Sequence, residues 1–340
     1  MERIIYDGRQ DEKMLAEVLG ETIGELMEED SRVVFLDADL ANCSKTGYLK
    51  KKYPGRMIDV GIAEADMIGI AAGLSAQGFK PYVHSFGAFA SRRCYDQAFL
   101  SAGYAGNAIT IIGSDPGVTA AYNGGTHMPF EDTGMYRLMP EAAVIDITDS
   151  VMLKNILKEA KERPGVKYIR MHRKYARSVF APGTETPVGK AAILKEGKDA
   201  VILASGIMVH EAMQAAAELD EKGISTGVVN VYTIKPLDET GILSACRGKK
   251  AVLTAENSSC IGGLYEAVCE LFCRCEPRHI EAVAVQDEFG EVGPIEYLQE
   301  RFGLTKRHIM EKVEDAVQKY CRCKIVTVQP SRKGMGNSAG

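Results

Sequence analysis

A regular alternation of short β-rich runs with helix-length amphipathic runs constrains this chain more than any other feature of its sequence. Residues 33–37 (Val-Val-Phe-Leu-Asp) are typical of the first kind, and residues 64–77, which are rich in Gly and Ala, are typical of the second. Strands and helices that alternate in this way form a parallel sheet with helices on both faces. We therefore expect an α/β protein, and its 340 residues predict two domains, each a three-layer α/β unit.

The first domain is expected over residues 1–180 and the second over 190–325. Residues 176–190 indicate a linker, because they include Pro182, Gly183 and Pro187 and lose the apolar period. Expected strands lie at 33–37, 79–84, 108–113, 143–147, 166–170, 200–204, 226–231, 250–255 and 281–285. Expected helices lie at about 11–28, 64–77, 90–102, 150–162, 207–222, 239–246, 262–274 and 306–319. A long Gly-rich loop follows the strand at 108–113, and the tail at 328–340 has nothing to pack, which predicts disorder.

Charge and hydropathy exclude two classes of partner. The formal net charge is −5 and the longest basic run is the lysine triplet at 50–52, whereas nucleic-acid binding needs a concentrated positive surface. No stretch approaches the roughly 20 apolar residues of a membrane helix, and the first residues lack the apolar segment of a signal peptide. We therefore expect a cytoplasmic protein that binds neither nucleic acid nor membrane.

The nine cysteines are scattered, which fits a reducing compartment better than a disulfide framework. The densest group, Cys269, Cys273 and Cys275, lacks Cys-x-x-Cys spacing, and its only neighbouring histidine is His279. We therefore expect no zinc site.

Glu64 is the first of three candidate features for chemistry. It opens the Gly- and Ala-rich helix at 64–77, which can pack very closely against a neighbour and bury the carboxylate. A carboxylate at this place is also favoured by the helix dipole alone, so both interpretations stay open on the pattern by itself.

Phe86 and Phe89 are the second feature. They lie three residues apart, directly after an expected strand, where ligands of α/β proteins bind. Together they could form a wall for a flat heterocycle, although core packing explains them as well.

The loop at 122–132 displays His127, which is the third feature. Such a histidine could donate or shuttle a proton. The sequence pattern fits an ordinary solvated loop histidine equally well.

In this order and spacing, the three segments resemble the pyrimidine-binding domain of the transketolase family of thiamine diphosphate enzymes. The resemblance is carried by residues 37–40 (Asp-Ala-Asp-Leu), 61–65 (Gly-Ile-Ala-Glu-Ala), the Phe-rich run that ends in Asp96-Gln97, and 125–129 (Gly-Thr-His-Met-Pro). Residues 232–238 and 256–264 resemble the carboxyl-terminal domain of the same family. The likeness extends over residues 10 to 322.

One part of the family pattern is missing. Complete members carry a diphosphate-binding domain in which Gly-Asp-Gly and a later Asn hold Mg²⁺ and the cofactor diphosphate, and this chain has no Gly-Asp-Gly. The chain therefore looks like the carboxyl-terminal subunit of a split transketolase. The resemblance implies thiamine diphosphate as cofactor, Mg²⁺ ligands on an amino-terminal partner subunit and not on this chain, and two copies of each chain in the particle.

The resemblance also implies roles for individual residues. Glu64 would be protonated and would hydrogen-bond the aminopyrimidine ring nitrogen of the cofactor, which requires a desolvated carboxyl group. Phe86, Phe89 and Arg93 would contact the cofactor, His127 would donate to substrate oxygens, and Arg137 and Arg170 would bind the anionic end of a substrate.

Two departures limit the choice of substrate. Asn123 stands where transketolases that act on sugar phosphates usually have an acidic residue that recognises a sugar hydroxyl. Ser114 stands where those enzymes often have a phosphate-binding histidine. An unusual anionic ketose, including a sulfonated one, is therefore compatible with this sequence.

The leading hypothesis is thus a subunit that transfers a two-carbon ketol unit from a ketose to an aldose. The rival enzyme readings are a deoxyxylulose phosphate synthase-like subunit and a 2-oxo acid dehydrogenase β-like subunit. A non-catalytic scaffold is the rival from another class, although a scaffold has no need of Glu64, Phe89 and His127 together.

Overall fold

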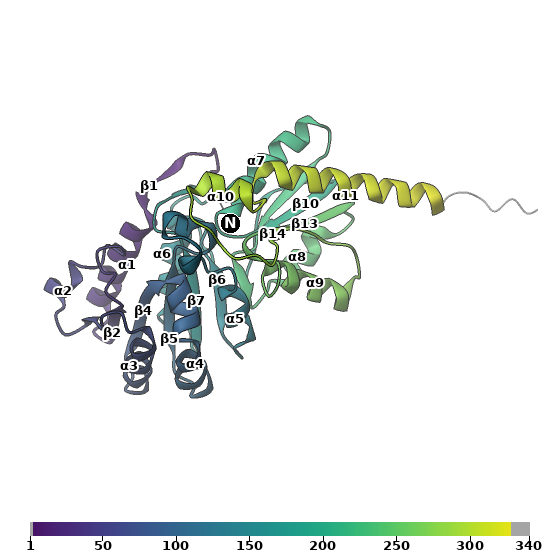
Figure 1. The fold of residues 1–340 in the computed structure, drawn as a ribbon. Coiled ribbons are helices and arrows are strands. Elements are labelled where there is room, and N and C mark those ends of the chain that lie inside the picture. The colour runs from purple at the N-terminus through teal and green to yellow at the C-terminus, as the bar shows by residue number, and fades with distance from the viewer. Residues whose placement is uncertain (1–2, 328–340) are drawn as a thin grey trace, which may run out of the picture.

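The computed structural model describes residues 3–327 and contains two large sheets flanked by helices (Figure 1). The first sheet has the strand order β12-β6-β7-β5-β4-β2-β3, and its pairs are parallel except β12 with β6. Its strands are β2 (Val33–Asp37), β3 (Met57–Asp59), β4 (Lys80–Phe86), β5 (Ile109–Ser114), β6 (Ala143–Asp146), β7 (Val166–Met171) and β12 (Thr233–Lys235). The α/β fold class is therefore confirmed.

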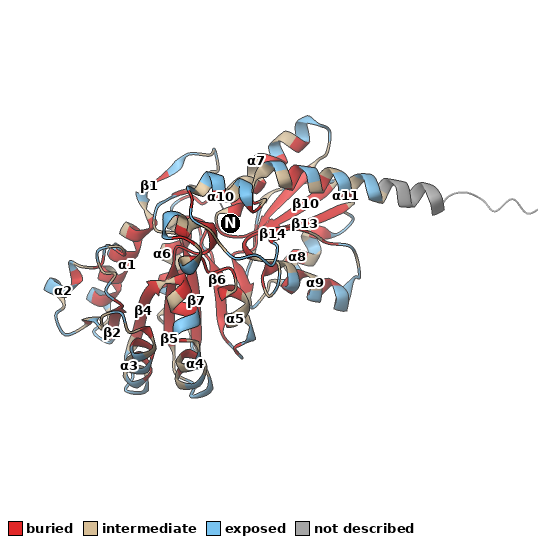
Figure 2. Cartoon of the chain, viewed as in Figure 1, coloured by how far each residue is buried: buried red, intermediate tan, exposed pale blue. Residues whose placement is uncertain are grey.

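Helices cover both faces of this sheet because neighbouring strand residues point to opposite sides. Ile112 packs in one core cluster with residues of α1 (Leu15–Glu29) and α6 (Ser150–Ala160), whereas Ile111 packs in another with residues of α3 (Glu64–Ala76). The strands are buried along almost their whole length, as parallel strands between two helical layers must be (Figure 2).

The second sheet has the order β14-β13-β10-β11-β9, and only β9 runs antiparallel to its neighbour. Its strands are β9 (Ala192–Lys195), β10 (Ala200–Ala204), β11 (Thr226–Asn230), β13 (Ala251–Ser259) and β14 (Glu281–Val285). The helices of this half are α7 (Met208–Glu221), α8 (Glu239–Cys246), α9 (Leu264–Cys275), α10 (Ile295–Arg301) and α11 (Lys306–Thr327).

The chain returns once from the second half to the first sheet. Thr233 of β12 pairs with Ile145 of β6, so residues expected in the second domain extend the sheet of the first. The domain limits at 1–180 and 190–325 stay a prediction, and the tail expected at 328–340 lies outside the described residues.

The expected helix at 11–28 begins late. Residues Gln10–Met14 form β1, which pairs with β8 (Tyr175–Arg177) at the start of the expected linker, and α1 begins at Leu15. The Glu17 carboxylate accepts the Met14 backbone N–H at 2.9 Å, which caps the helix there. The prediction was wrong for these residues because their pairing partner lies far away in the sequence.

The expected helix at 90–102 is irregular. It consists of two π-helical segments, η1 (Phe89–Arg93) and η2 (Ala98–Tyr104), on either side of the short α4 (Tyr95–Gln97). The Ser91 hydroxyl donates to the Gly87 carbonyl at 2.6 Å, and such side-chain bonds compete with the helical ladder. The Gly-rich loop after β5 also contains helical turns that the sequence did not predict, namely η3 (Gly117–Asn123), η4 (Gly125–His127) and α5 (Asp132–Leu138).

Further elements went unpredicted, all of them short: α2 (Leu49–Lys52), β3, β9, β12 and α10. Within residues 3–327, no helix combines the length and the apolar character that crossing a membrane requires.

Candidate functional site

Glu64 is buried at the start of α3, with 1% of its surface exposed. Its Oε1 accepts a hydrogen bond from Ser85 Oγ at 2.7 Å, and its Oε2 accepts one from Arg93 Nη1 at 2.8 Å. Ser85 belongs to β4 and Arg93 to η1, so two elements besides α3 hold the carboxylate. Both oxygens are therefore oriented before any ligand arrives.

An aromatic cluster lies next to this carboxylate. Phe86 ends β4 and Phe89 begins η1, and their ring centroids are 6.4 Å apart in an edge-on arrangement. The His127 ring contacts both, at 4.9 Å from Phe89 and 5.8 Å from Phe86. The structure thus brings together the carboxylate, the two rings and the histidine that the sequence singled out separately.

The loop that carries His127 is held in place by glycine. A Cβ on Gly125 would lie 2.1 Å from the carbonyl oxygen of Gly290, so only glycine allows the loop after β14 to approach this closely. On the other side, Thr126 Oγ1 lies 2.9 Å from His127 Nδ1. The loop between β14 and α10 therefore supports the position of His127 from the second half of the chain.

Arg93 lies between Glu64 and Phe89. Besides its bond to Glu64, its guanidinium carbon stands 3.9 Å from the centroid of the Phe89 ring. The Arg93 side chain is 41% exposed, in contrast to the buried carboxylate that it contacts.

Arg173 is a candidate that the sequence reasoning missed. It lies two residues beyond the end of β7, and its guanidinium carbon lies 5.0 Å from the Phe86 centroid. Asp115 holds it, with Nε at 2.7 Å and Nη2 at 2.6 Å from Asp115 Oδ2. The available signal was its place just beyond the carboxyl end of a buried strand, where α/β ligand sites lie.

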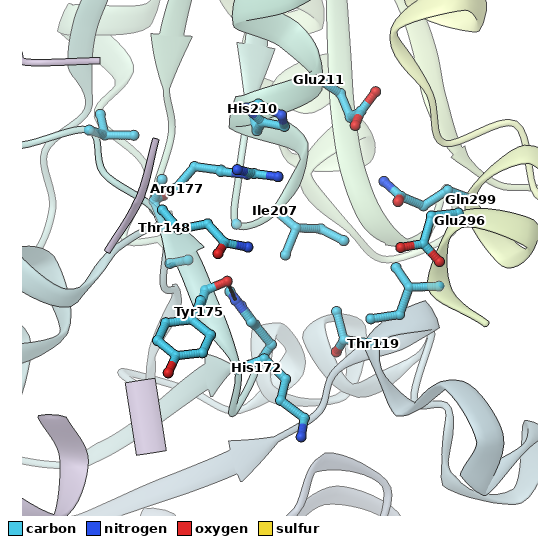
Figure 3. A pocket seen from close by; sticks show the side chains of 16 residues that line it. Thr119, Thr148, His172, Tyr175, Arg177, Ile207, His210, Glu211, Glu296 and Gln299 are labelled. Carbon is cyan, nitrogen blue, oxygen red and sulfur yellow. Dashed lines mark hydrogen bonds between the residues drawn. The ribbon is translucent and has the colours of Figure 1, made fainter. Parts of the chain in front are cut away.

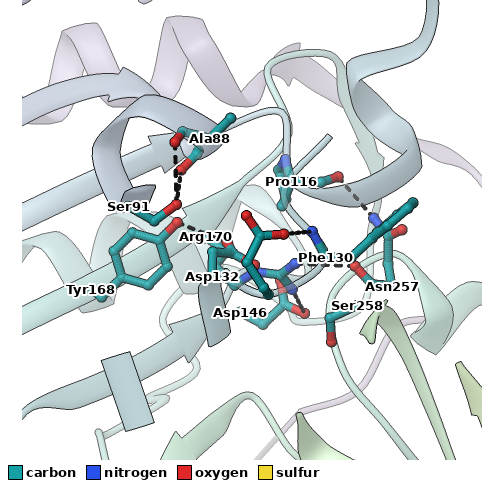
Figure 4. A network of polar contacts seen from close by, with 12 residues as sticks. Ala88, Ser91, Pro116, Phe130, Asp132, Asp146, Tyr168, Arg170, Asn257 and Ser258 are labelled. Carbon is teal, nitrogen blue, oxygen red and sulfur yellow. Dashed lines mark hydrogen bonds and ion pairs between the residues drawn. The ribbon is translucent and has the colours of Figure 1, made fainter. Parts of the chain in front are cut away.

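Arg170 does not reach this group. It lies within β7 and is fully buried, with Nε 2.8 Å from Asp132 Oδ2 and Nη1 3.1 Å from Asp146 Oδ2 (Figure 4). Its Nη2 also donates to the Asn257 carbonyl at 3.0 Å, which links the two halves of the chain. Each of its three guanidinium nitrogens has an internal partner, and its complete burial closes it to a substrate in this position.

Arg137 is also placed elsewhere. Its Nη1 donates to the carbonyls of Gly262 and Gly263 at 2.6 and 3.0 Å, at the start of α9. Arg137 therefore links α5 to the start of α9 in the second half of the chain.

Ser114 and Asn123 lie at different depths. Ser114 is fully buried, and its Oγ is 3.1 Å from His84 Nε2, while His84 Nδ1 is 2.8 Å from Asp37 Oδ2. This chain of three side chains lies across β5, β4 and β2. Asn123, by contrast, is exposed at the end of η3.

A separate cavity of about 400 Å³ lies between the two halves of the chain (Figure 3). Its lining includes Thr148, His172, Arg177, His210 and Glu211, and it does not include Glu64, Phe89 or His127. Burial lowers the pKa of His172, and it lowers the pKa of His210 to about 4, so the His210 imidazole is neutral near pH 7.

Among residues 3–327, no group of three or more His, Cys, Asp and Glu side chains is arranged to hold a metal ion. The cluster of Glu64, Phe86, Phe89 and His127 instead suits a flat nitrogen heterocycle. A ring that stacks on Phe89 could exchange hydrogen bonds with the buried carboxylate, and His127 and Arg173 could face a polar, anionic molecule beside it. An aminopyrimidine fits these donors and acceptors.

Family models match nearly the whole chain. Residues 11–178 match the model "Transketolase, pyrimidine binding domain", and residues 189–309 match "Transketolase, C-terminal domain".

Individual relatives agree with these matches. The chain is 44% identical over 314 residues to 6-deoxy-6-sulfo-D-fructose transketolase subunit SqwH from Clostridium sp. (strain MSTE9), which covers 92% of this chain and 98% of the relative. It is 34% identical over 303 residues to a putative transketolase C-terminal section from Methanocaldococcus jannaschii, covering 88% and 95%. Among solved structures, one described as "Split gene transketolase, inactive beta4 tetramer" superposes with a TM-score of 0.82 at 35% identity, covering 90% of this chain and 98% of that one.

Proposed function

Because this chain belongs to the transketolase family of thiamine diphosphate-dependent enzymes, we propose that it is the carboxyl-terminal subunit of a two-chain transketolase, a transferase of two-carbon ketol units. The observation that carries the proposal is the convergence of Glu64, Phe89 and His127 at the carboxyl end of the first sheet. The alternatives have weaker support. The 1-deoxy-D-xylulose-5-phosphate synthases among the relatives are 30–32% identical to this chain, against 44% for the transketolase subunit from Clostridium, and the dehydrogenase-like and scaffold hypotheses draw no support from the relatives reported above.

Thiamine diphosphate, when bound, supplies a nucleophilic carbon and an electron sink for breaking the bond between two substrate carbons. In our proposal, Glu64 holds a proton at the pyrimidine nitrogen, and burial of its carboxyl group excludes water from that proton. Phe89 and Phe86 orient the ring, and His127 donates a hydrogen bond to substrate oxygens. The Mg²⁺ ligands and the diphosphate site would belong to the partner subunit.

We propose an anionic ketose, and specifically a sulfonated one, as donor. The relative from Clostridium is named for 6-deoxy-6-sulfo-D-fructose. Arg173 offers a guanidinium beside the aromatic cluster, and guanidinium matches oxyanion geometry. Asn123 and Ser114 stand where sugar-phosphate enzymes carry other groups, which supports a substrate other than the usual phosphates.

The assembly we propose contains two copies of this chain and two of an amino-terminal subunit that carries Gly-Asp-Gly, in the cytoplasm. The tetramer named for the split-gene relative is consistent with self-association of such chains.

The proposal can be tested by co-expressing this chain with a candidate amino-terminal subunit and measuring ketol transfer to an aldose acceptor. The donors would be 6-deoxy-6-sulfo-D-fructose, fructose 6-phosphate and fructose, with thiamine diphosphate and Mg²⁺ present. We expect transfer from the anionic donors and a higher kcat/KM with the sulfonate. Transfer from the phosphate alone would overturn the choice of donor, and no transfer from any ketose would overturn the transketolase activity itself.

A further inference from the structure

Arg93 contacts both groups that the proposed function reserves for the pyrimidine ring. Its guanidinium carbon lies 3.9 Å from the Phe89 centroid, and its Nη1 lies 2.8 Å from Glu64 Oε2. A guanidinium is flat, carries N–H donors and stacks on aromatic faces, so it presents the same features as a protonated aminopyrimidine.

The Arg93 guanidinium and the pyrimidine ring cannot both stack on this face of Phe89. The Arg93 guanidinium lies over one face of the Phe89 ring and donates to one oxygen of the Glu64 carboxylate. Glu64 Oε1 also accepts a hydrogen bond from Ser85, so both oxygens of the carboxylate already have a donor. A second flat group cannot stack on the same face of Phe89 while the guanidinium remains there.

We propose that Arg93 is a placeholder, which takes the place of the pyrimidine ring on Phe89 and Glu64 and moves out when the ring binds. This inference rests on the proposed function, and it changes the role expected for Arg93 from cofactor ligand to competitor.

The energetics favour such an arrangement. Glu64 is 1% exposed, and an unpaired buried carboxylate is costly, so a counter-ion is needed while the cofactor is absent. The Arg93 side chain is 41% exposed, so it can turn into solvent without breaking the core. Because only the fraction of chains with Arg93 displaced can bind, the placeholder weakens the apparent affinity for the cofactor.

The test is the affinity of the two-chain complex for thiamine diphosphate, measured by calorimetry at saturating Mg²⁺ without substrate. We expect Arg93→Gln to bind roughly tenfold more tightly than wild type, because the competitor is gone. Arg93→Lys keeps the charge but not the flat stack, and should lie between the two. The matched control is Arg92→Gln, since Arg92 bonds the Thr126 carbonyl and Glu131 and not Glu64.

A double-mutant comparison shows whether the effect passes through the carboxylate. In the Glu64→Gln background, Arg93→Gln should change the affinity for the cofactor much less. Equal or weaker binding by Arg93→Gln, with normal binding by wild type, would overturn the placeholder and leave the proposed function intact. If neither wild type nor any variant bound the cofactor, the proposed function would fail and the placeholder with it.

Discussion

At the scale of single residues, Glu64 carries the sharpest prediction. We expect Glu64→Gln to reduce turnover of the two-chain enzyme by roughly 100-fold or more, because the amide keeps the shape but cannot give and take a proton. Arg93 can still donate to the amide oxygen, and the buried Ser85 hydroxyl can accept the amide N–H, so the fold should survive.

Steady-state kinetics with parallel thermal melts provide the measurement. Turnover near the wild-type value would return Glu64 to the simpler role of a carboxylate at a helix N-terminus.

The arginines allow a matched pair of variants. Arg173→Gln should raise the KM for an anionic ketose by roughly 10- to 100-fold, since charged hydrogen bonds are worth about 1.5–3 kcal/mol. Arg137→Gln should leave that KM unchanged, because Arg137 bonds the carbonyls of Gly262 and Gly263 away from the aromatic cluster. Equal effects of the two changes on KM would contradict the placement of the anion beside Arg173.

His210 predicts a pH dependence of stability. Burial, with Arg177 and Lys306 nearby, lowers its pKa to about 4 in the folded chain, against an ordinary value near 6.5. Between these values the unfolded chain binds the proton and the folded chain does not, so stability falls as the pH drops from about 6.5 to 4.

The variant His210→Gln lacks this titration, although it also loses the bond to the Tyr6 hydroxyl at 2.6 Å. Wild type should therefore be the more stable protein at pH 7.5, and its advantage in melting temperature should shrink towards pH 4.5. A constant difference across this range would show that His210 does not titrate as described.

At the scale of elements, α3 has two roles. Its first residue is Glu64, and its exposed face carries Gly69 and Gly73, where an added Cβ would meet no atom within 4 Å in the chain itself. That open face suits a second copy of the chain, as expected for an assembly with two copies.

Gly73→Leu tests this face without disturbing the monomer core. We expect the chain to fold but the assembly to dissociate into inactive halves, because overpacking a close contact costs about 1–3 kcal/mol at each of two symmetric positions. Light scattering on the co-purified complex measures the mass. Ala217→Leu, on an exposed position of α7, is the control, and an active particle with one copy of each chain would exclude pairing through α3.

At the scale of the whole molecule, our proposal gives this chain one side of a cofactor site. The side chains proposed to hold the pyrimidine ring lie together in the chain, whereas the sequence contains no Gly-Asp-Gly to hold Mg²⁺ and the diphosphate. We therefore expect the purified chain alone to show no turnover of any ketose and only weak binding of thiamine diphosphate, and to gain both properties when the partner subunit is added.

Calorimetry and a coupled assay on the two samples provide this comparison. Turnover by this chain alone, with cofactor and Mg²⁺, would show that the enzyme is not split.

The α/β class and most long elements were predictable from the sequence by itself, because apolar periodicity and β-rich runs are local properties. Strand β2 matches its expected limits, 33–37, and α3 begins at the expected residue, Glu64. The candidates were also singled out from the sequence: Glu64 at a helix start, Phe86 and Phe89 after an expected strand where α/β ligands bind, and His127 in a loop, with the family resemblance joining them. Their catalytic roles stay a prediction.

Only the tertiary structure decided which groups meet. Residues 10–14 become a strand and β12 joins the first sheet because their partners, β8 and β6, lie far away in the sequence. The same limit applies to the cations, since no local pattern shows that Arg170 points into a buried ion-pair network while Arg173, three positions later, lies against Phe86. Burial and charge pairing depend on contacts distant in sequence, and these contacts also place Arg93 on the two groups proposed for the cofactor ring.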